Sequence, residues 1–503
     1  MTETTAVPVR LTDAIAPVPL HLFGSFVEHM GRCVYTGIYE PGHPTADEDG
    51  FRGDVLALTR ELGVTIVRYP GGNFVSGYRW EDGVGPVEQR PRRLETAWHE
   101  IEPNTIGLHE FMAWARKADI EVMEAVNLGT RGIEDAMRLV EYANHPGGTA
   151  LSDERRSNGA EEPFGIRIWC LGNEMDGPWQ LGAKTADEYG RLAQETAKGM
   201  RLVDQNVQLV LAGSSGPDMP TFGQWERTIL RHAYEHVQYL SLHAYFQERP
   251  GQLDHFLTAA ARLDAFITDV AAIVDEIRDE GGHTHTVALA LDEWNVWNQD
   301  RFNDPEHQLE TLNGPWLDHP RVIEDTYTVT DAVVVGTLLH ALLRRSDRVT
   351  IANQAQLVNV IAPIMTEPGG PAWRQATFWP FARIAHLARG VVTSVETGSP
   401  SLDAVATVDE AAGVGAFFVA NIATDAAVTV SVELPLIGGR AASVDAAEIL
   451  ADSDRLAVNS LEDPDRVTLA ALIVEVEDGV ATFELPTLSW ACLRLSGDVG
   501  VPA

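Results

Sequence analysis

The chain has 503 residues, a formal net charge of −36, 45% hydrophobic residues and 22% charged residues. This is the composition of a globular protein, and the length allows about three domains, or one large barrel with a smaller module. The strong negative charge repels phosphate groups, so we expect neither nucleic acid nor an anionic membrane as a partner. A neutral substrate is the natural expectation.

The N-terminal segment and the cysteines argue against two further classes of protein. Residues 1–17 lack the cationic stretch and apolar run of a signal peptide. Cys33, Cys170 and Cys492 are far apart and form no CxxC pair, so we expect neither a disulfide framework nor a zinc cluster. The most apolar helical stretch, 332–343, is too short to span a membrane. These features predict a cytoplasmic protein.

Short apolar runs alternate with amphipathic helical stretches over most of the chain. Continuous runs such as Val-Ala-Leu-Ala-Leu at 287–291 are typical of parallel strands covered on both faces. A capping box at Thr185 predicts a helix start, and 254–280 and 325–345 are longer helical regions. The predicted strands are 20–26, 64–69, 120–127, 166–171, 207–213, 239–243, 287–291 and 349–352. This alternation predicts a (β/α)8 TIM barrel, with a doubly wound open sheet as the alternative.

After about Gly390 the pattern changes to short alternating segments separated by Gly, Pro and Asp turns. The segments 415–421, 427–434 and 488–495 are examples. Such segments predict a C-terminal antiparallel β-sandwich domain of the jelly-roll type.

Polar clusters follow seven of the eight predicted barrel strands. The clusters begin at Ser25, Arg68, Asn127, Gly172, His243, Asp292 and Asn353. Each one alone could be a turn or a helix cap. Because functional residues of a barrel collect at the carboxyl ends of its strands, the clusters together predict a polar pocket.

Glu174 and Glu293 follow the fourth and seventh predicted strands, which face each other across the mouth of a barrel. Hydrolysis of a glycosidic bond needs one carboxylic acid to protonate the leaving oxygen and one carboxylate to attack or to activate water. Proximity of the two would keep one of them protonated. The alternative is that each merely caps a helix or pairs with Arg68 or Arg167.

Other chemistries have weaker support. HExxH and the Walker pattern are absent from the sequence. His29, His243 and Asp292 lack the tight spacing of metal ligands, so we predict neither a metal nor another cofactor. We interpret His243 as a hydrogen-bond partner that orients Glu293. Aromatic residues near the strand ends suit stacking on sugar faces.

These motifs resemble the α-L-arabinofuranosidases of glycoside hydrolase family 51, within a clan of retaining (β/α)8-barrel glycosidases. The resembling stretches occur in order along the barrel. They are 23–29 (FGSFVEH), 68–74 (RYPGGNF), 98–104 (WHEIEPN), 169–179 (WCLGNEMDGPW), 241–245 (SLHAY), 292–297 (DEWNVW) and 355–359 (AQLVN).

The resemblance implies a role for each matching residue. Glu174 would be the general acid/base and Glu293 the nucleophile that forms an arabinosyl-enzyme. The residues implied to bind substrate are Asn173 at the 2-hydroxyl, Glu28, Asn73, Tyr245 and Gln356 at the other furanose hydroxyls, and Trp98 and Trp179 at the rim. The family often has Cys where this chain has Asn73. Gln354 competes with Gln356 for its role, and the Ala-Gln-x-Val-Asn pattern favours Gln356.

The resemblance also implies that an N-terminal strand, about 5–17, joins the C-terminal sandwich and that subunits assemble as a homo-hexamer. The expected domains are a catalytic barrel, 18–385, and a sandwich formed by 1–17 with 386–503. We predict an exo-acting retaining hydrolase that releases terminal α-L-arabinofuranose from neutral arabino-oligosaccharides, as in arabinan catabolism. The alternatives are a β-xylosidase or β-glucanase of the same clan, or a non-catalytic sugar-binding barrel.

Overall fold

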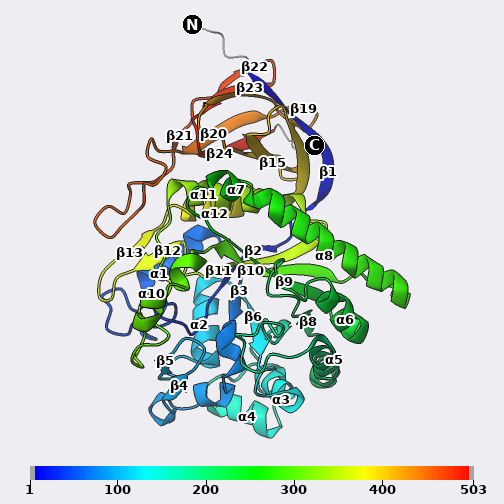
Figure 1. The fold of residues 1–503 in the computed structure, drawn as a ribbon, viewed down its shortest axis with the longest axis vertical. Helices are drawn as coiled ribbons and strands as arrows, with labels where there is room; N and C mark the ends of the chain where they lie inside the picture. Colours follow the sequence, from blue (N-terminus) through cyan, green and yellow to red (C-terminus); the bar gives the residue numbers. More distant parts are fainter. Residues whose placement is uncertain (1–5, 498–503) are drawn as a thin grey trace, which may run out of the picture.

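The computed structural model describes residues 6–497, which form a barrel and a sheet-rich part stacked on it (Figure 1). The barrel is closed by eight parallel strands in the order β10-β11-β2-β3-β6-β7-β8-β9. The strands are β2 His21–Phe26, β3 Ile66–Tyr69, β6 Glu121–Val126, β7 Ile168–Leu171, β8 Gln208–Leu211, β9 Tyr239–Phe246, β10 Ala288–Val296 and β11 Val349–Ala355. The predicted TIM barrel is therefore confirmed, and the open sheet is excluded.

Helices follow the barrel strands and cover them. They are α1 Gly53–Leu62, α2 Leu108–Ala118, α3 Ile133–Asn144, α4 Ala150–Ser157, α5 Ala186–Val203, α6 Gln224–Ala233, α7 Leu253–Leu257, α8 Ala259–Gly281, α9 Gln299–Phe302, α10 Pro305–Glu310, α11 Val329–Arg344 and α12 Phe378–Leu387. Short 3-10 turns lie at η1 Asn73–Ser76, η2 Trp80–Gly83, η3 Val87–Gln89 and η4 Tyr234–His236. Within the described residues, none of the helices has the length and apolar character to cross a membrane.

Local sequence accounts for where these helices begin and end. Helix α5 starts at the predicted capping box, where the Thr185 hydroxyl accepts a hydrogen bond from the amide of Glu188. The helical region predicted at 254–280 is broken at Thr258, which separates α7 from α8. The region predicted at 325–345 becomes helical only at Val329, because Thr328 forms the N-cap with Asp331.

Three barrel strands extend further than predicted, and one of them, β11, ends at Ala355 and not at residue 352. The apolar runs stop at His243 and Leu291, but β9 continues to Phe246 and β10 to Val296. The parallel pairing continues through polar residues, with Glu293 opposite His243 and Asn295 opposite Tyr245. Glu293 and Tyr245 therefore project from strands rather than from loops, and ladder hydrogen bonds hold their backbones in place.

The C-terminal part is a ten-stranded sheet in the order β21-β20-β24-β16-β15-β14-β1-β17-β23-β22. Its strands are β1 Val7–Pro17, β14 Val391–Thr397, β15 Leu402–Asp409, β16 Val414–Asn421, β17 Val428–Glu433, β20 Ser443–Leu450, β21 Ala470–Ala471, β22 Glu475–Glu477, β23 Val480–Leu485 and β24 Ser489–Ser496. Val9, Phe417, Val430, Phe483 and Leu493 share one core, so the sheet folds over on itself. This confirms an antiparallel sheet domain, with one parallel pair between β1 and β17.

The N-terminal strand β1 lies inside this sheet, antiparallel to β14 and parallel to β17. The division into a barrel, 18–385, and a sandwich, 1–17 with 386–503, stays a prediction. Its upper boundary falls within helix α12, Phe378–Leu387. Residues 1–5 and 498–503 of the predicted sandwich lie outside the described range.

Helices α11 and α12 lie between the barrel and the sheet domain (Figure 1). His340 of α11 is fully buried at this junction, where its Nδ1 lies 2.7 Å from Asp403 Oδ1. Its Nε2 accepts a hydrogen bond of 3.1 Å from the indole of Trp490. Burial lowers the pKa of His340, which fits a neutral ring that donates at Nδ1 and accepts at Nε2. One polar side chain thus connects a barrel helix to two strands of the sheet.

Three two-stranded sheets complete the fold of residues 6–497. They are β4 Arg93–Glu95 with β5 Glu100–Glu102, β12 Ile364–Thr366 with β13 Ala372–Arg374, and β18 Leu436–Ile437 with β19 Arg440–Ala441. The first follows β3 and the second follows β11, so both extend from the carboxyl ends of barrel strands.

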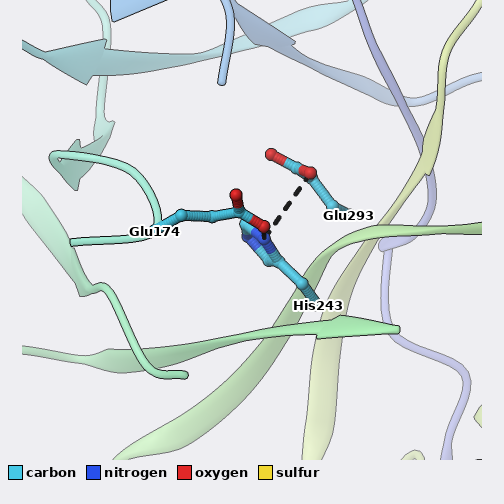
Figure 2. Close-up of side chains that lie close together, drawn as sticks. All are labelled: Glu174, His243 and Glu293. Atoms are coloured by element: carbon cyan, nitrogen blue, oxygen red, sulfur yellow. Dashed lines mark hydrogen bonds and ion pairs between the residues drawn. The ribbon is translucent and has the colours of Figure 1, made fainter. Parts of the chain in front are cut away.

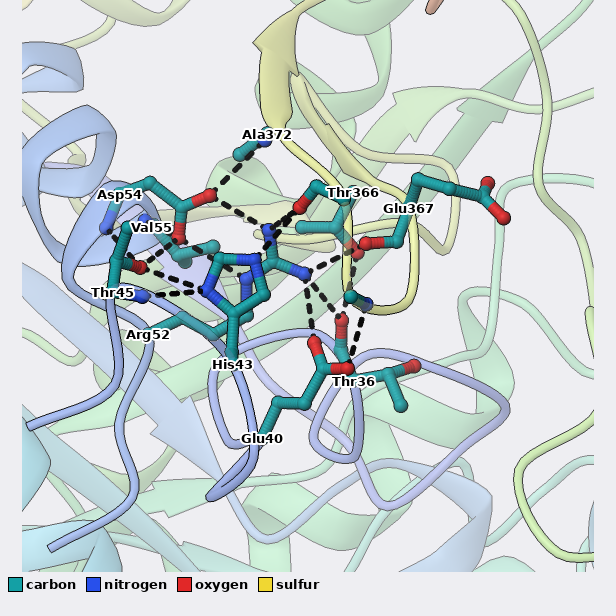
Figure 3. Close-up of polar contacts among 12 residues, drawn as sticks. Thr36, Glu40, His43, Thr45, Arg52, Asp54, Val55, Thr366, Glu367 and Ala372 are labelled. Atoms are coloured by element: carbon teal, nitrogen blue, oxygen red, sulfur yellow. Dashed lines mark hydrogen bonds and ion pairs between the residues drawn. The ribbon is translucent and has the colours of Figure 1, made fainter.

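A buried arginine joins the long loop after β2 to the β12–β13 hairpin (Figure 3). The guanidinium of Arg52 pairs with Asp54 at 2.7 Å and with Glu40 at 3.0 Å. It also donates to the carbonyl oxygens of Glu367 at 3.0 Å and Gly370 at 2.7 Å. With its charge paired and its donors satisfied, Arg52 can remain buried and hold the two segments together. Both segments start from strands that lead into the cavity described below.

Candidate active site

A cavity of about 840 Å³ opens at the carboxyl ends of the barrel strands. Carboxylates, amides and aromatic rings line it, as suits a neutral ligand rich in hydroxyl groups. The predicted site residues in its wall are Glu28, Asn73, Trp98, Glu174, Trp179, Tyr245, Glu293 and Gln356. The polar pocket expected from the strand ends therefore exists.

Glu174 lies in the turn that follows β7. Its backbone has φ +43°, a left-handed conformation that residues with side chains rarely adopt, and its carbonyl accepts a 2.8 Å hydrogen bond from the amide of Gly177. Its Oε1 accepts from Nδ1 of His243 at 2.9 Å, and its Oε2 accepts from the indole Nε1 of Trp179 at 2.6 Å. Burial raises the pKa of Glu174, the Glu293 carboxylate raises it further, and the two hydrogen bonds oppose this rise.

Glu293 projects from strand β10 and is held at both oxygens. Oε1 accepts a hydrogen bond of 2.6 Å from Nη1 of Arg68, and Oε2 accepts one of 2.9 Å from the hydroxyl of Tyr245. The Arg68 guanidinium, buried on β3, also lies 3.2 Å from Asp292. Burial works to lower the pKa of Arg68, but the carboxylates of Asp292 and Glu293 raise it above its usual range. The pairing of Glu293 with Arg68, considered above as an alternative, is thus part of the site.

His243 connects the two carboxylates (Figure 2). Its Nδ1 is 2.9 Å from Glu174 and 3.5 Å from Glu293, and its Nε2 is 3.5 Å from Asp292. The shorter contact is therefore to Glu174, whereas sequence analysis favoured an orienting role toward Glu293. Burial works to lower the pKa of His243, but Glu293, Asp292 and Glu174 raise it to about 10. Asp292 in turn has a lowered pKa, because Arg68 and His243 offset its burial.

Glu28 lines the cavity from the segment that follows β2. Its Oε1 accepts hydrogen bonds of 3.0 Å from the amides of Gly72 and Phe74 and from the indole of Trp98. Its Oε2 accepts one of 3.2 Å from the amide of Gln356. Burial raises the pKa of Glu28 to about 8, against the hydrogen bonds from Phe74 and Trp98. This network orders two predicted site residues, Trp98 and Gln356, around the carboxylate of a third.

Asn173 and His243 are the predicted site residues that lie behind the cavity wall, where both are buried. The Asn173 amide oxygen accepts a 2.7 Å hydrogen bond from Nη2 of Arg68, and its Nδ2 lies 3.4 Å from the side-chain oxygen of Asn73. Gln354 is buried and donates to Asn295 at 3.2 Å, whereas Gln356 lines the cavity, as the sequence pattern favours.

Sequence reasoning missed two features of the site. It places Arg68 in a strand-end cluster and offers it as a pairing partner of a glutamate, but it does not predict that Arg68 holds both Glu293 and Asn173. It also misses a group of residues that lines the cavity from the segment after β10, and no motif or apolar period marks this group in the sequence. The group comprises Gln299, Phe302, Asn303, Gln308 and Leu312.

A metal ion is the other species that the central cluster could accept. Glu174, His243 and Glu293 each offer one ligand atom, and these atoms lie within 4.8 Å of one another. The nitrogens of Arg68 and His243 already supply positive charge to both carboxylates, at 2.6 and 2.9 Å. We therefore interpret the cluster as a site for proton transfer and assign no metal ligands. The predicted absence of a metal and of a cofactor stays a prediction.

The fold and the site together define a class of protein. Two buried carboxylates meet in a polar cavity at the mouth of a (β/α)8 barrel, with oxygens within 4.8 Å of each other. Retaining glycosidases place their two carboxyl groups about 5–5.5 Å apart, whereas inverting ones leave about 6.5–9.5 Å. The arrangement is that of a retaining glycoside hydrolase.

Comparison with known proteins gives the family. Residues 58–266 match the α-L-arabinofuranosidase 1 domain, and residues 292–489 match the α-L-arabinofuranosidase C-terminal domain. An exo-α-(1→6)-L-arabinofuranosidase of Bifidobacterium longum is 50% identical over 96% of this chain and 95% of its own. An intracellular exo-α-(1→5)-L-arabinofuranosidase of Bacillus subtilis is 48% identical over 96% and 97%.

Solved structures agree with the sequence matches. A family 51 α-L-arabinofuranosidase from Bifidobacterium longum superposes with a TM-score of 0.92 at 44% identity, covering 98% of this chain and 100% of that one. An α-L-arabinofuranosidase from Thermotoga maritima, solved as an arabinose complex, has a TM-score of 0.86 at 29% identity over 98% and 100%. The chain belongs to the family 51 α-L-arabinofuranosidases.

Proposed function

We propose that the protein is an exo-acting retaining hydrolase that releases terminal non-reducing α-L-arabinofuranosyl residues from arabino-oligosaccharides. The observation that carries the proposal is the pair of carboxylates in the cavity, whose oxygens lie within 4.8 Å. Relatives at 48–50% identity are named exo-arabinofuranosidases, which supports the substrate class.

Glu293 is the nucleophile in this proposal and Glu174 the general acid/base. In the first step a carboxylate oxygen of Glu293 bonds to the anomeric carbon, the glycosidic bond breaks, and Glu174 gives its proton to the leaving oxygen. In the second step Glu174 takes a proton from water, the water oxygen bonds to the anomeric carbon, and Glu293 leaves as a carboxylate. The raised pKa of Glu174 suits a group that starts as an acid.

The remaining site residues position the sugar. Glu28, Asn73, Asn173, Tyr245 and Gln356 are proposed to bind furanose hydroxyls, since all carry donors or acceptors in or just behind the cavity wall. Trp98 and Trp179 are proposed to line the rim where the leaving group departs, and His243 to hold Glu174.

Several finer features belong to the proposal. Relatives from Bacillus subtilis and Streptomyces lividans are named intracellular, which supports a cytoplasmic role in arabinan catabolism for this chain. Its assembly as a homo-hexamer has support only from the family resemblance. Light scattering coupled to size-exclusion chromatography measures that assembly directly, and a monomer mass of 54.9 kDa would contradict it.

The experiment that tests the function is turnover on nitrophenyl glycosides. We expect nitrophenyl α-L-arabinofuranoside to be cleaved well, and nitrophenyl xylopyranoside and β-glucan poorly. Proton NMR during the first turnovers should show the product with the substrate's anomeric configuration. Preference for the xylopyranoside or the glucan, or an inverted product, would contradict the proposal.

A further inference from the structure

Both oxygens of the proposed acid are occupied by hydrogen-bond donors. Oε1 of Glu174 accepts from His243 at 2.9 Å, and Oε2 accepts from the indole of Trp179 at 2.6 Å. A general acid needs one carboxyl oxygen within hydrogen-bond reach of the leaving oxygen, about 2.6–3.2 Å. The leaving oxygen must therefore approach a carboxyl oxygen that already accepts a hydrogen bond, and there it competes with the donor in place.

The two donors differ in how firmly they are held. His243 is 2% exposed, projects from strand β9 and is also paired with Asp292. Trp179 is 54% exposed and lies on the turn after β7, in the cavity wall. Oε2, with the indole at the rim, is thus the oxygen that a leaving group entering the cavity can reach.

The absence of a side chain at Gly177 makes room for the indole of Trp179. A Cβ atom at Gly177 would lie 2.7 Å from the nearest carbon of the Trp179 ring and 2.9 Å from its Nε1. These distances are below normal contact, so the ring packs directly against the backbone of Gly177. The indole of Trp179 is thus held by packing against the turn at Gly177 and by its hydrogen bond to Glu174. It can leave this position without the movement of a strand.

We propose that Trp179 acts as a displaceable latch, whose indole N–H caps Oε2 of Glu174 in the free enzyme and yields this oxygen to the leaving group of the bound substrate. The inference rests on the proposed role of Glu174 as the acid/base. It makes Trp179 a positioning residue whose hydrogen bond is broken during the catalytic cycle.

The latch also affects the proton on Glu174. A hydrogen bond donated to a carboxylate favours the charged form, so the seated indole favours a deprotonated Glu174. When the indole leaves, the acid form becomes more favourable at the moment it is needed. The other groups that face Glu174 are His243 and Tyr245 from β9 and Glu293 from β10, with Arg68 from β3 behind Glu293. Their contacts run through Oε1 or through Glu293 and do not involve the indole.

The test is Trp179→Phe, which keeps an aromatic ring and removes the N–H, assayed on an unactivated arabino-oligosaccharide. The pH profile of kcat/KM reports the free enzyme, and that of kcat reports the substrate complex. Because Glu174 must be protonated in the first step, its pKa sets the basic limb of kcat/KM. It sets that of kcat as well where the first step limits turnover, as is expected for the poor leaving group of an unactivated oligosaccharide. We expect the basic limb of kcat/KM to move up by about 0.5–1 pH unit, and that of kcat to stay in place.

A second variant keeps the indole and removes its seat. In Gly177→Ala the new methyl group pushes the ring off, so the same shift in kcat/KM is expected although Trp179 is unchanged. Leu181→Ala is the matched control: it alters an exposed apolar side chain of the same cavity wall, and both limbs should keep their wild-type pH. Thermal unfolding of each variant checks that the fold is retained.

Two results would overturn the latch. Equal shifts of both limbs would mean that the indole stays on Oε2 in the complex. No shift in either variant, with the fold retained, would mean that the hydrogen bond does not act on Glu174. Failure of the wild-type enzyme to cleave any arabinofuranoside would instead overturn the proposed function itself, so the two failures are distinguishable.

Discussion

The two proposed catalytic carboxylates, Glu293 and Glu174, are held by parts of the cavity wall that differ in structure. Glu293 projects from strand β10 and is gripped by Arg68 and Tyr245 from strands β3 and β9. Glu174 lies in a turn with φ +43°, and one of its two partners is the exposed Trp179. The difference fits the proposed division of labour, because a nucleophile must keep its position and charge, whereas an acid/base must exchange partners twice per turnover.

Removing the carboxylate of Glu293 should have the largest effect on kcat. Glu293→Ala deprives the reaction of its nucleophile, so kcat should fall by about 10⁴-fold or more on every substrate. Steady-state rates on nitrophenyl α-L-arabinofuranoside measure this. A variant within tenfold of wild type would show that Glu293 is not the nucleophile.

Removing the carboxylate of Glu174 should slow the hydrolysis of some substrates more than that of others. Glu174→Ala should slow oligosaccharide hydrolysis by about 10²–10⁴-fold. Cleavage of the nitrophenyl glycoside should suffer much less at the first step, because nitrophenolate leaves without a proton. Equal losses on both substrates would contradict the acid assignment.

The hydrogen bonding that holds Glu293 can be weakened while its carboxylate is kept. Tyr245→Phe deletes one hydrogen bond to a charged group, for which about 1.5–3 kcal/mol predicts a fall of about 10- to 150-fold in kcat/KM. Tyr239→Phe is the matched control at the start of the same strand, where the hydroxyl donates to Gln208 at 2.7 Å. If both variants lose the same activity, the effect arises from strand β9 and not from the contact with Glu293.

The smallest effect is expected from a substitution at the start of helix α5, which follows the turn that carries Glu174. Thr185 caps helix α5, and Thr185→Ala should lower the free energy of unfolding by about 1 kcal/mol. Chemical denaturation measures this change. If the Glu174 wall is held by its own turn contacts, kcat should not change, and a large fall in kcat would show that the wall depends on the helix start.

Much of the barrel was predictable because its strands are continuous apolar runs, such as 287–291, that admit few other structures. The polar continuation of β9 and β10 was not, since Glu293 and Tyr245 lie in strands only through pairing between segments distant in sequence. The candidate carboxylates could be chosen from their place after strands. Arg68 and His243 could be named as possible partners, but the carboxylate that each contacts most closely could not, because this depends on side-chain direction in three dimensions.

The segment after β10 shows a second limit. Phe302 reaches the cavity from a short helix, where its ring centroid lies 5.2 Å from that of Trp297. A four-residue helix such as α9, Gln299–Phe302, has too few residues to show an apolar period. The position of α9 is set by packing against residues at the rim of the cavity, such as Trp297. The local sequence of the helix does not reveal this packing.

Strand β1 has a consequence for the order of folding. It precedes the barrel in the chain, but its neighbours in the sheet are β14, which begins at Val391, and β17, which ends at Glu433. A chain growing from its N-terminus therefore completes the whole barrel before β1 can find either partner, and this long-range closure is expected to be slow. Until then the hydrophobic residues of β1, including Val9, remain without their core. Trimming the chain past Pro17 would part β14 from β17 and separate six strands of the sheet from the other three.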